Sequence, residues 1–107
     1  MNLYLLRHGI AVEPGTPDYE IDADRPLTSK GGERMRDIAG AMQALELSFD
    51  CILTSPYLRA RQTAEIVADK LEARKKLHST PHLAPGGDPK KLFAELNRLN
   101  PAPRALC

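Results

Sequence analysis

The sequence contains no tryptophan, and its aromatic residues are three tyrosines and two phenylalanines. So few rings do not provide the stacking surface on which proteins bind single-stranded nucleic acids. An excess of one charge is also missing, because 15 basic and 14 acidic residues leave a net charge of +1. This near-neutral charge gives no electrostatic reason to expect nucleic acid or an anionic membrane as a partner.

Cysteines are scarce, and no apolar run is long enough to span a membrane. Cys51 lies within an apolar run and is expected to be a small buried hydrophobe, and Cys107 is the last residue. Two thiols without a spacing pattern predict no disulfide framework and fit a reducing compartment. The apolar start of the chain lacks the charged lead-in of a signal peptide. We therefore expect a cytoplasmic protein.

The sequence does contain an alternation of strand and helix patterns. The segments, in order, are strand 2–8, helix 28–45, strand 49–55, helix 55–71, strand 76–78, helix 88–99 and a strand start at 104–107. Such an alternation is typical of a parallel sheet covered by helices. We predict a single α/β domain over residues 1–107, with three α/β/α layers and a mostly parallel sheet.

Two of the predicted strands end in residues that suit an active site. Arg7, His8 and Gly9 follow the first strand, and Ser55 follows the second. In parallel sheets, active sites lie beyond the carboxyl ends of the strands. We therefore expect these residues to meet at one edge of the sheet.

Ser55 is followed by Pro56, which predicts a helix capped by the serine with proline at its first position. The free N–H groups and positive dipole end of such a helix attract anions. Arg59 and Gln62, three residues apart, are expected to face this end together. The start of the helix is therefore a candidate phosphate site that includes Ser55 and Arg59.

The combination suits phosphoryl transfer through a histidine nucleophile. The imidazole of His8 can attack phosphorus while the guanidinium groups of Arg7 and Arg59 hold its other oxygens. Gly9 is expected to let the backbone pass close to the phosphate. Singly, these residues have ordinary explanations, because a histidine after a strand is often a polar cap and helix arginines are often solvated. The joint pattern is more specific than its parts.

Three segments, LYLLRHG (3–9), RPLTSKG (25–31) and LTSPYLRARQTAE (53–65), resemble the histidine phosphatase superfamily, also called the phosphoglycerate-mutase-like fold. The resemblance extends over nearly the whole chain and is closest to the SixA-type phosphohistidine phosphatases. It implies that His8 is the phosphorylated nucleophile and that other residues bind phosphate or line the pocket, namely Arg7, Arg25 and Arg59.

The family pattern also includes a second histidine, on a strand-end motif resembling LVGHEP that follows the segments above. The chain ends at PAPRALC without it, and we therefore expect an N-terminal portion of the fold, with turnover near background. His78 and His82 are not expected to substitute, because they lie in a segment broken by serine, threonine and proline.

The substrate class is inferred from the proton donor. Superfamily branches with larger substrates use a carboxylic acid to protonate a leaving alkoxide. Here Asp88 is expected to cap a helix and Glu95 to face solvent. Cleavage of a P–N bond needs less help from an acid, which favours phosphohistidine on a signalling or phosphorelay protein. The alternatives are a small-molecule phosphomonoesterase and a catalytically silent module that binds phosphate or phosphohistidine.

Other chemistries fit less well. The sequence has no G-x-x-x-x-G-K-[ST] motif, which argues against a P-loop. Cys51 and Arg59 do not have the spacing of a cysteine phosphatase. His78 and His82 could share a metal only on a helix, which their surroundings disfavour. We therefore expect neither a metal nor another cofactor.

Overall fold

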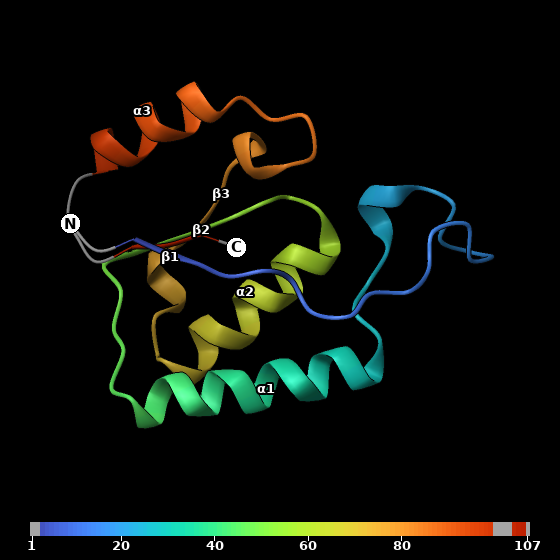
Figure 1. Ribbon diagram of the computed structural model, residues 1–107, viewed down its shortest axis with the longest axis horizontal. Helices are drawn as coiled ribbons and strands as arrows, with labels where there is room; N and C mark the ends of the chain where they lie inside the picture. The colour runs from blue at the N-terminus through green and yellow to red at the C-terminus, as the bar shows by residue number, and fades with distance from the viewer. Residues whose placement is uncertain (1–2, 100–103, 107) are drawn as a thin grey trace.

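The computed structural model describes residues 3–99 and 104–106, which form a parallel sheet with helices on both faces (Figure 1). The strands are β1 (Leu3–Leu5), β2 (Cys51–Thr54), β3 (Leu77–Ser79) and β4 (Arg104–Leu106). Their order is β1-β4-β2-β3, and each neighbouring pair is parallel. The predicted strand positions at Asn2 and Cys107 lie outside the described residues. The last strand of the sequence thus joins β1 to β2.

The helices are α1 (Ser29–Ala44), α2 (Leu58–Lys70) and α3 (Pro89–Leu99), with short 3₁₀ turns η1 (Asp22–Asp24), η2 (Arg74–Lys76) and η3 (Pro81–Leu83). The predicted caps of the first and third helices are confirmed. Thr28 Oγ1 accepts a hydrogen bond from the N–H of Gly31 at 2.9 Å, and Asp88 Oδ1 accepts one from the N–H of Lys90 at 2.9 Å. These caps fix the residues at which α1 and α3 begin.

The second helix begins later than predicted. Ser55 Oγ accepts from the backbone N–H of Tyr57 at 3.2 Å, but α2 itself begins at Leu58. The serine hydroxyl closes a local turn that precedes the helix instead of capping the helix. The prediction that Ser55 and Pro56 form the helix start is therefore wrong, although Ser55 stays at the end of β2.

Helices α1 and α2 cover one face of the sheet and α3 covers the other (Figure 1). Residues of β2 contribute to an apolar core on each face of the sheet, because successive side chains of a strand point to opposite faces. Ile52 packs with Phe49, Ala64 and Ala68, whereas Cys51 and Leu53 pack with Leu92 and Leu96 of α3. The three-layer α/β/α prediction is confirmed.

The loop after β1 lies directly against the first turn of α1. A Cβ added to Gly31 would lie 2.1 Å from the carbonyl oxygen of Ile10, so only glycine fits there. Ile10 also accepts the backbone N–H of Thr28 at 2.8 Å. This close approach holds the residues that follow His8 against the helix layer.

Within the described residues, no helix is long and apolar enough to cross a membrane. The same residues contain no cluster of three or more histidine, cysteine, aspartate or glutamate side chains that could hold a metal ion.

Candidate active site

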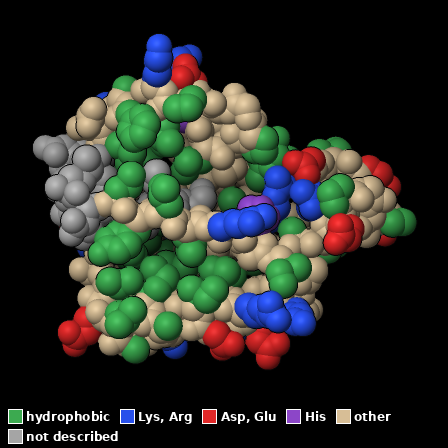
Figure 2. Space-filling model, viewed as in Figure 1, with side chains coloured by type: hydrophobic (Ala, Val, Ile, Leu, Met, Phe, Trp, Pro, Cys, Tyr) green, Lys and Arg blue, Asp and Glu red, His purple; other side chains and the backbone are tan. Residues whose placement is uncertain are grey.

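The carboxyl ends of β1 and β2 meet at one edge of the sheet. A cavity of about 300 Å³ at this edge is lined by Arg7, His8, Ser55, Tyr57, Arg59 and the segment 83–85. The predicted juxtaposition of the two strand ends is therefore present. Figure 2 shows this face, where Lys and Arg side chains gather around a histidine beside a projecting lobe that carries acidic side chains.

A second cavity, of about 280 Å³, adjoins the same residues. It is lined by Arg7, His8, Gly9 and Arg25, together with the segment 10–11. Because Arg7 and His8 line both cavities, the imidazole lies between a cavity with Arg59 and a cavity with Arg25. All five of the other predicted site residues thus line the two cavities that contain His8.

The imidazole of His8 is held by its own backbone neighbour. Its Nδ1 lies 2.7 Å from the carbonyl oxygen of Gly9. A carbonyl oxygen can only accept a hydrogen bond, so Nδ1 carries the proton of the neutral ring. Nε2 then keeps its lone pair, which is the form a nitrogen nucleophile needs.

Gly9 has a packing role as well. A Cβ at this position would lie 2.7 Å from Cγ of Met35 and 3.2 Å from the carbonyl oxygen of Gly31. Its N–H donates to Thr63 Oγ1 at 3.1 Å, and the Thr63 hydroxyl donates to the carbonyl of Arg59 at 2.8 Å. The strand end and the first turns of α2 are joined through this one hydroxyl.

Arg59 is buried although it is charged. Its Nη1 donates to the carbonyl oxygen of Asp22 at 2.9 Å, and its Nη2 donates to Asp22 Oδ2 at 3.2 Å. The guanidinium carbon lies 5.0 Å from the centre of the Tyr57 ring, a cation–π distance. These contacts fix the plane of the guanidinium group beside the cavity.

Arg25 binds the same carboxylate from the other side. Its Nε donates to Asp22 Oδ1 at 2.8 Å, its Nη2 lies 2.7 Å from that oxygen, and its Nη1 donates to the carbonyl of Val12 at 2.6 Å. The hydrogen bond from Arg25, followed by the contacts with Arg59, lowers the pKa of Asp22 against an opposing effect of desolvation. Asp22 is therefore ionised at neutral pH.

Arg7 differs from the other two arginines. Its side chain is exposed, and within the described residues it has neither an ion pair nor a side-chain hydrogen bond. A guanidinium group in this state keeps all five N–H donors for an incoming anion. The cationic surroundings of His8 therefore combine two anchored arginines with one free arginine.

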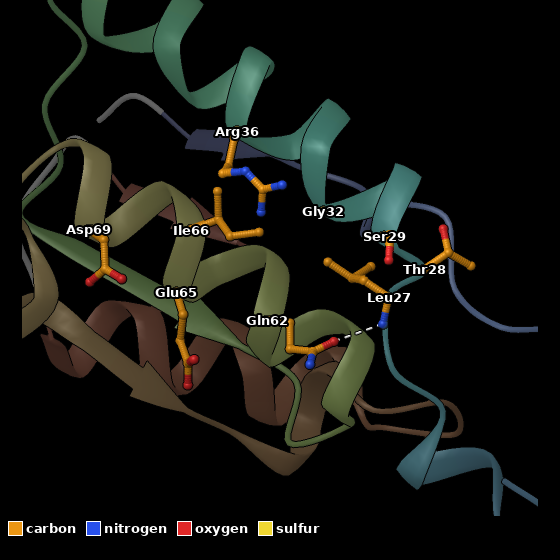
Figure 3. A pocket seen from close by; sticks show the side chains of 9 residues that line it. All are labelled: Leu27, Thr28, Ser29, Gly32, Arg36, Gln62, Glu65, Ile66 and Asp69. Carbon is orange, nitrogen blue, oxygen red and sulfur yellow. Dashed lines mark hydrogen bonds between the residues drawn. The ribbon is translucent and has the colours of Figure 1, made fainter. Parts of the chain in front are cut away.

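Gln62 does not share the site with Arg59. Its Oε1 accepts from the backbone N–H of Leu27 at 2.7 Å, and it lines a groove of about 470 Å³ between α1 and α2 (Figure 3). Neither His8 nor Arg59 lines this groove. The expectation that Gln62 and Arg59 face one anion together is wrong.

The other two histidines lie elsewhere, as expected. His78 is exposed on β3, and His82 lines a separate cavity with Lys91, Glu95 and Arg98. Glu95 was expected to face solvent. It is half-buried instead and accepts a hydrogen bond from the buried Thr80 hydroxyl at 2.7 Å. Asp88 is a helix cap, as predicted.

Sequence reasoning missed three parts of the site, namely Asp22, Thr63 and the segment 83–85. Asp22 precedes Arg25 by three residues and Thr63 follows Arg59 by four, so each lies one turn from a predicted site residue. That spacing is the only signal that could have identified them. No motif in the sequence marks the segment 83–85, because its position at the cavity depends on how the chain folds after β3.

Known proteins similar to this chain identify its family. The profile of the histidine phosphatase superfamily (branch 1) matches residues 3–95. The chain is 48% identical over 105 residues to an uncharacterized protein of Picosynechococcus sp., covering 98% of this chain and 62% of that protein. It is 34% identical over 99 residues to the phosphohistidine phosphatase SixA of Escherichia coli K12, covering 92% of this chain and 59% of that protein.

A solved structure of the protein histidine phosphatase SixA complexed with tungstate superimposes with a TM-score of 0.84 at 32% identity. The match covers 99% of this chain and 67% of that one. The chain thus spans about three fifths of the length of these two curated relatives. On the profile match and the shared fold, the chain belongs to the histidine phosphatase superfamily.

Proposed function

We propose that the protein is a phosphohistidine phosphatase that works through a phosphorylated His8. The observation that carries the proposal is the hydrogen bond between His8 Nδ1 and the Gly9 carbonyl, which in the neutral ring leaves the lone pair of Nε2 for attack, in a histidine that lines two cavities together with arginines. The likeness to SixA, which was solved with the tetrahedral oxyanion tungstate, supports the same reading.

The reaction has two displacements. Nε2 of His8 attacks the phosphorus of the substrate, so an N–P bond forms as the P–N bond to the substrate imidazole breaks, and the leaving imidazole takes a proton from solvent water. Water then attacks the phosphorus of phospho-His8, the N–P bond breaks, and inorganic phosphate leaves with the water oxygen and its proton, so that Nε2 of His8 is free again. Arg7 and Arg59 stabilise the oxygens whose charge grows in both transition states, and Arg25, Ser55 and Gly9 complete the walls.

The residues that line the two cavities support the choice of substrate class. Among the described residues that line the two cavities, none is an aspartate or a glutamate. An alkoxide leaving group needs a strong proton donor, whereas imidazole does not. This favours a phosphohistidine on a signalling or phosphorelay protein over a small-molecule phosphomonoester, which is the second candidate.

The nucleophile is tested by phosphorylation. The chain is incubated with a phosphoramidate donor, and the acid-labile phosphate is mapped by mass spectrometry. Label is expected on His8 and is expected to be absent in His8→Ala, while His78→Ala serves as the matched control. Label on His78 or His82 with His8 unmodified would contradict the proposal.

Turnover is tested on a phosphohistidine peptide and on a phosphomonoester. The family pattern includes a second histidine that residues 1–107 do not supply, and loss of one preorganised donor lowers rates by roughly 10²–10³. We therefore expect turnover near background for the chain and measurable turnover for its fusion to the part of the Picosynechococcus relative that it does not span. Equal rates for the two would contradict this account.

Arg59→Lys in that fusion is expected to lower turnover, because lysine cannot form the bidentate contact of a guanidinium group. Arg61→Lys is the matched control, since Arg61 is exposed and pairs with Glu65.

The activity of the fusion is expected to survive chelation of divalent metals. Phosphate binding without turnover in the fusion would favour the silent binding module.

A further inference from the structure

The two anchored arginines of the site depend on one carboxylate. Asp22 Oδ1 contacts Arg25 at 2.7–2.8 Å, and Asp22 Oδ2 contacts Arg59 at 3.2 Å. The Asp22 carbonyl accepts a further bond from Arg59 at 2.9 Å. A single residue of the turn η1 therefore orients cations that come from two other parts of the chain.

The burial of the arginines makes this contact more than a surface ion pair. The side chains of Arg25 and Arg59 are 13% and 10% exposed, whereas that of Asp22 is 51% exposed. Two guanidinium groups that share one carboxylate would repel each other without it, and burial limits how far water can replace the lost acceptor. The exposed carboxylate thus organises two largely buried cations.

The carboxylate does not occupy the place of a substrate anion. Asp22 lines neither of the cavities that contain His8, although Arg59 lines one and Arg25 lines the other. It approaches the guanidinium groups from outside the cavities. Arg59 uses two of its five N–H donors on Asp22, which leaves three for an anion.

We infer that Asp22 is a positioning residue, which holds Arg25 and Arg59 in the orientation that binds the phosphoryl group beside His8. The inference deepens the proposed function and rests on it. Asp22 touches no reacting atom and acts through the two arginines. Its negative charge also leaves the group Arg7, Arg25, Arg59 and Asp22 with a net charge of +2, which matches a phosphate dianion.

The test compares Asp22→Asn with Asp24→Asn in the chain itself. Asp24 is an exposed carboxylate of the same turn, and within the described residues it forms no ion pair with an arginine. The first readout is the set of arginine Nε–H resonances in NMR spectra, which report the order of Arg25 and Arg59 directly. The second is the Kd for inorganic phosphate from titration at 0.15 M ionic strength.

Asp22→Asn is expected to shift and broaden the resonances of Arg25 and Arg59 and to weaken phosphate binding roughly tenfold, a change of about 1.4 kcal/mol. Asp24→Asn is expected to change neither readout. Asp22→Glu, which restores the charge on a longer side chain, is expected to recover part of the affinity. It also serves as the test variant if Asp22→Asn does not fold.

Phosphate binding by Asp22→Asn as tight as that of Asp24→Asn, or tighter, would overturn the inference, because Asp22 would then only oppose the anion. Weaker binding with unchanged arginine resonances would overturn it too. If the resonances and the affinity change as expected but His8 is never phosphorylated, the proposed function fails and the positioning role stands.

Discussion

The backbone N–H of Gly9 donates to the hydroxyl of Thr63 at 3.1 Å, although 54 positions separate the two residues in the chain. The same hydroxyl donates to the carbonyl of Arg59 at 2.8 Å. The residue after His8 and the helical turn that carries Arg59 are therefore linked by one fully buried side chain. The distance between the candidate nucleophile and its candidate phosphate ligand depends on this link.

Thr63→Val keeps the shape of the side chain but removes the hydroxyl. The Gly9 N–H then loses its acceptor, so we expect the free energy of unfolding to fall by about 1–3 kcal/mol in urea denaturation. Thr63→Ser keeps the hydroxyl and controls for its loss, although it also removes a methyl group. If the free energy of unfolding of Thr63→Val were at least as large as that of Thr63→Ser, the hydrogen bond would contribute nothing to the stability of the fold.

The second prediction concerns two glycines of α1, at which alanine is expected to have opposite effects on stability. A Cβ at Gly31 would lie 2.1 Å from the Ile10 carbonyl oxygen, whereas a Cβ at Gly40 would lie 3.9 Å from Cε of Lys70, an ordinary van der Waals distance. Gly31→Ala is expected to destabilise the protein, by about 1–3 kcal/mol, as overpacking does. Gly40→Ala is expected to stabilise it by about 0.5–1 kcal/mol, because alanine favours the helix. Thermal unfolding of the two variants checks both signs.

Features set by local sequence could be predicted well. The caps at Thr28 and Asp88 are correct because a cap is a contact between a side chain and backbone only two or three residues away. The strand predicted to reach His8 ends at Leu5, but the residues that follow β1 and β2, with His8 and Ser55, meet as expected because parallel strands place their carboxyl ends at one edge. The role of Ser55 is an exception. Its hydroxyl could cap a helix or close a tighter turn with the N–H of Tyr57, and the structure shows the turn.

Features that depend on the path of the chain could not be predicted. The spacing of three residues predicts that Gln62 faces the same anion as Arg59, but three residues turn a helix through about 300°, so the two side chains differ by about 60° in direction. That difference is enough to turn Gln62 toward α1 and Leu27. The partners of Asp22 depend on how the loop 13–25 folds back over α2, and the position of β4 between β1 and β2 depends on long-range pairing.

The stability of the protein in acid is expected to depend on Asp22. Its pKa in the folded state is lowered, first by the Arg25 hydrogen bond, so the unfolded chain binds the proton more readily. The stabilisation is therefore present above the ordinary aspartate pKa of about 3.9 and is lost as the pH falls through the lower value.

Asp22→Asn removes this contribution. The difference in Tm between the unsubstituted protein and Asp22→Asn is expected to be largest near pH 7 and to shrink below about pH 4, the range in which the carboxylate is protonated. Asp24→Asn should show no comparable pH-dependent difference. A Tm difference for Asp22→Asn that stays constant from pH 7 to pH 3 would argue against the ionised contact.

The last prediction concerns β1, which among the described residues has a neighbouring strand on one side only. Leu5 on this strand is 76% exposed, and Leu3 and Tyr4 of the same strand are 41% and 39% exposed. An exposed apolar edge strand offers unpaired backbone groups to another chain, and a charged side chain there opposes such pairing. Leu5→Lys is therefore expected to raise the temperature at which light scattering begins. Leu45→Lys replaces a leucine that is 72% exposed but follows α1, and should raise it less. Equal effects would mean that exposed apolar area drives the aggregation of this protein and that the strand edge does not.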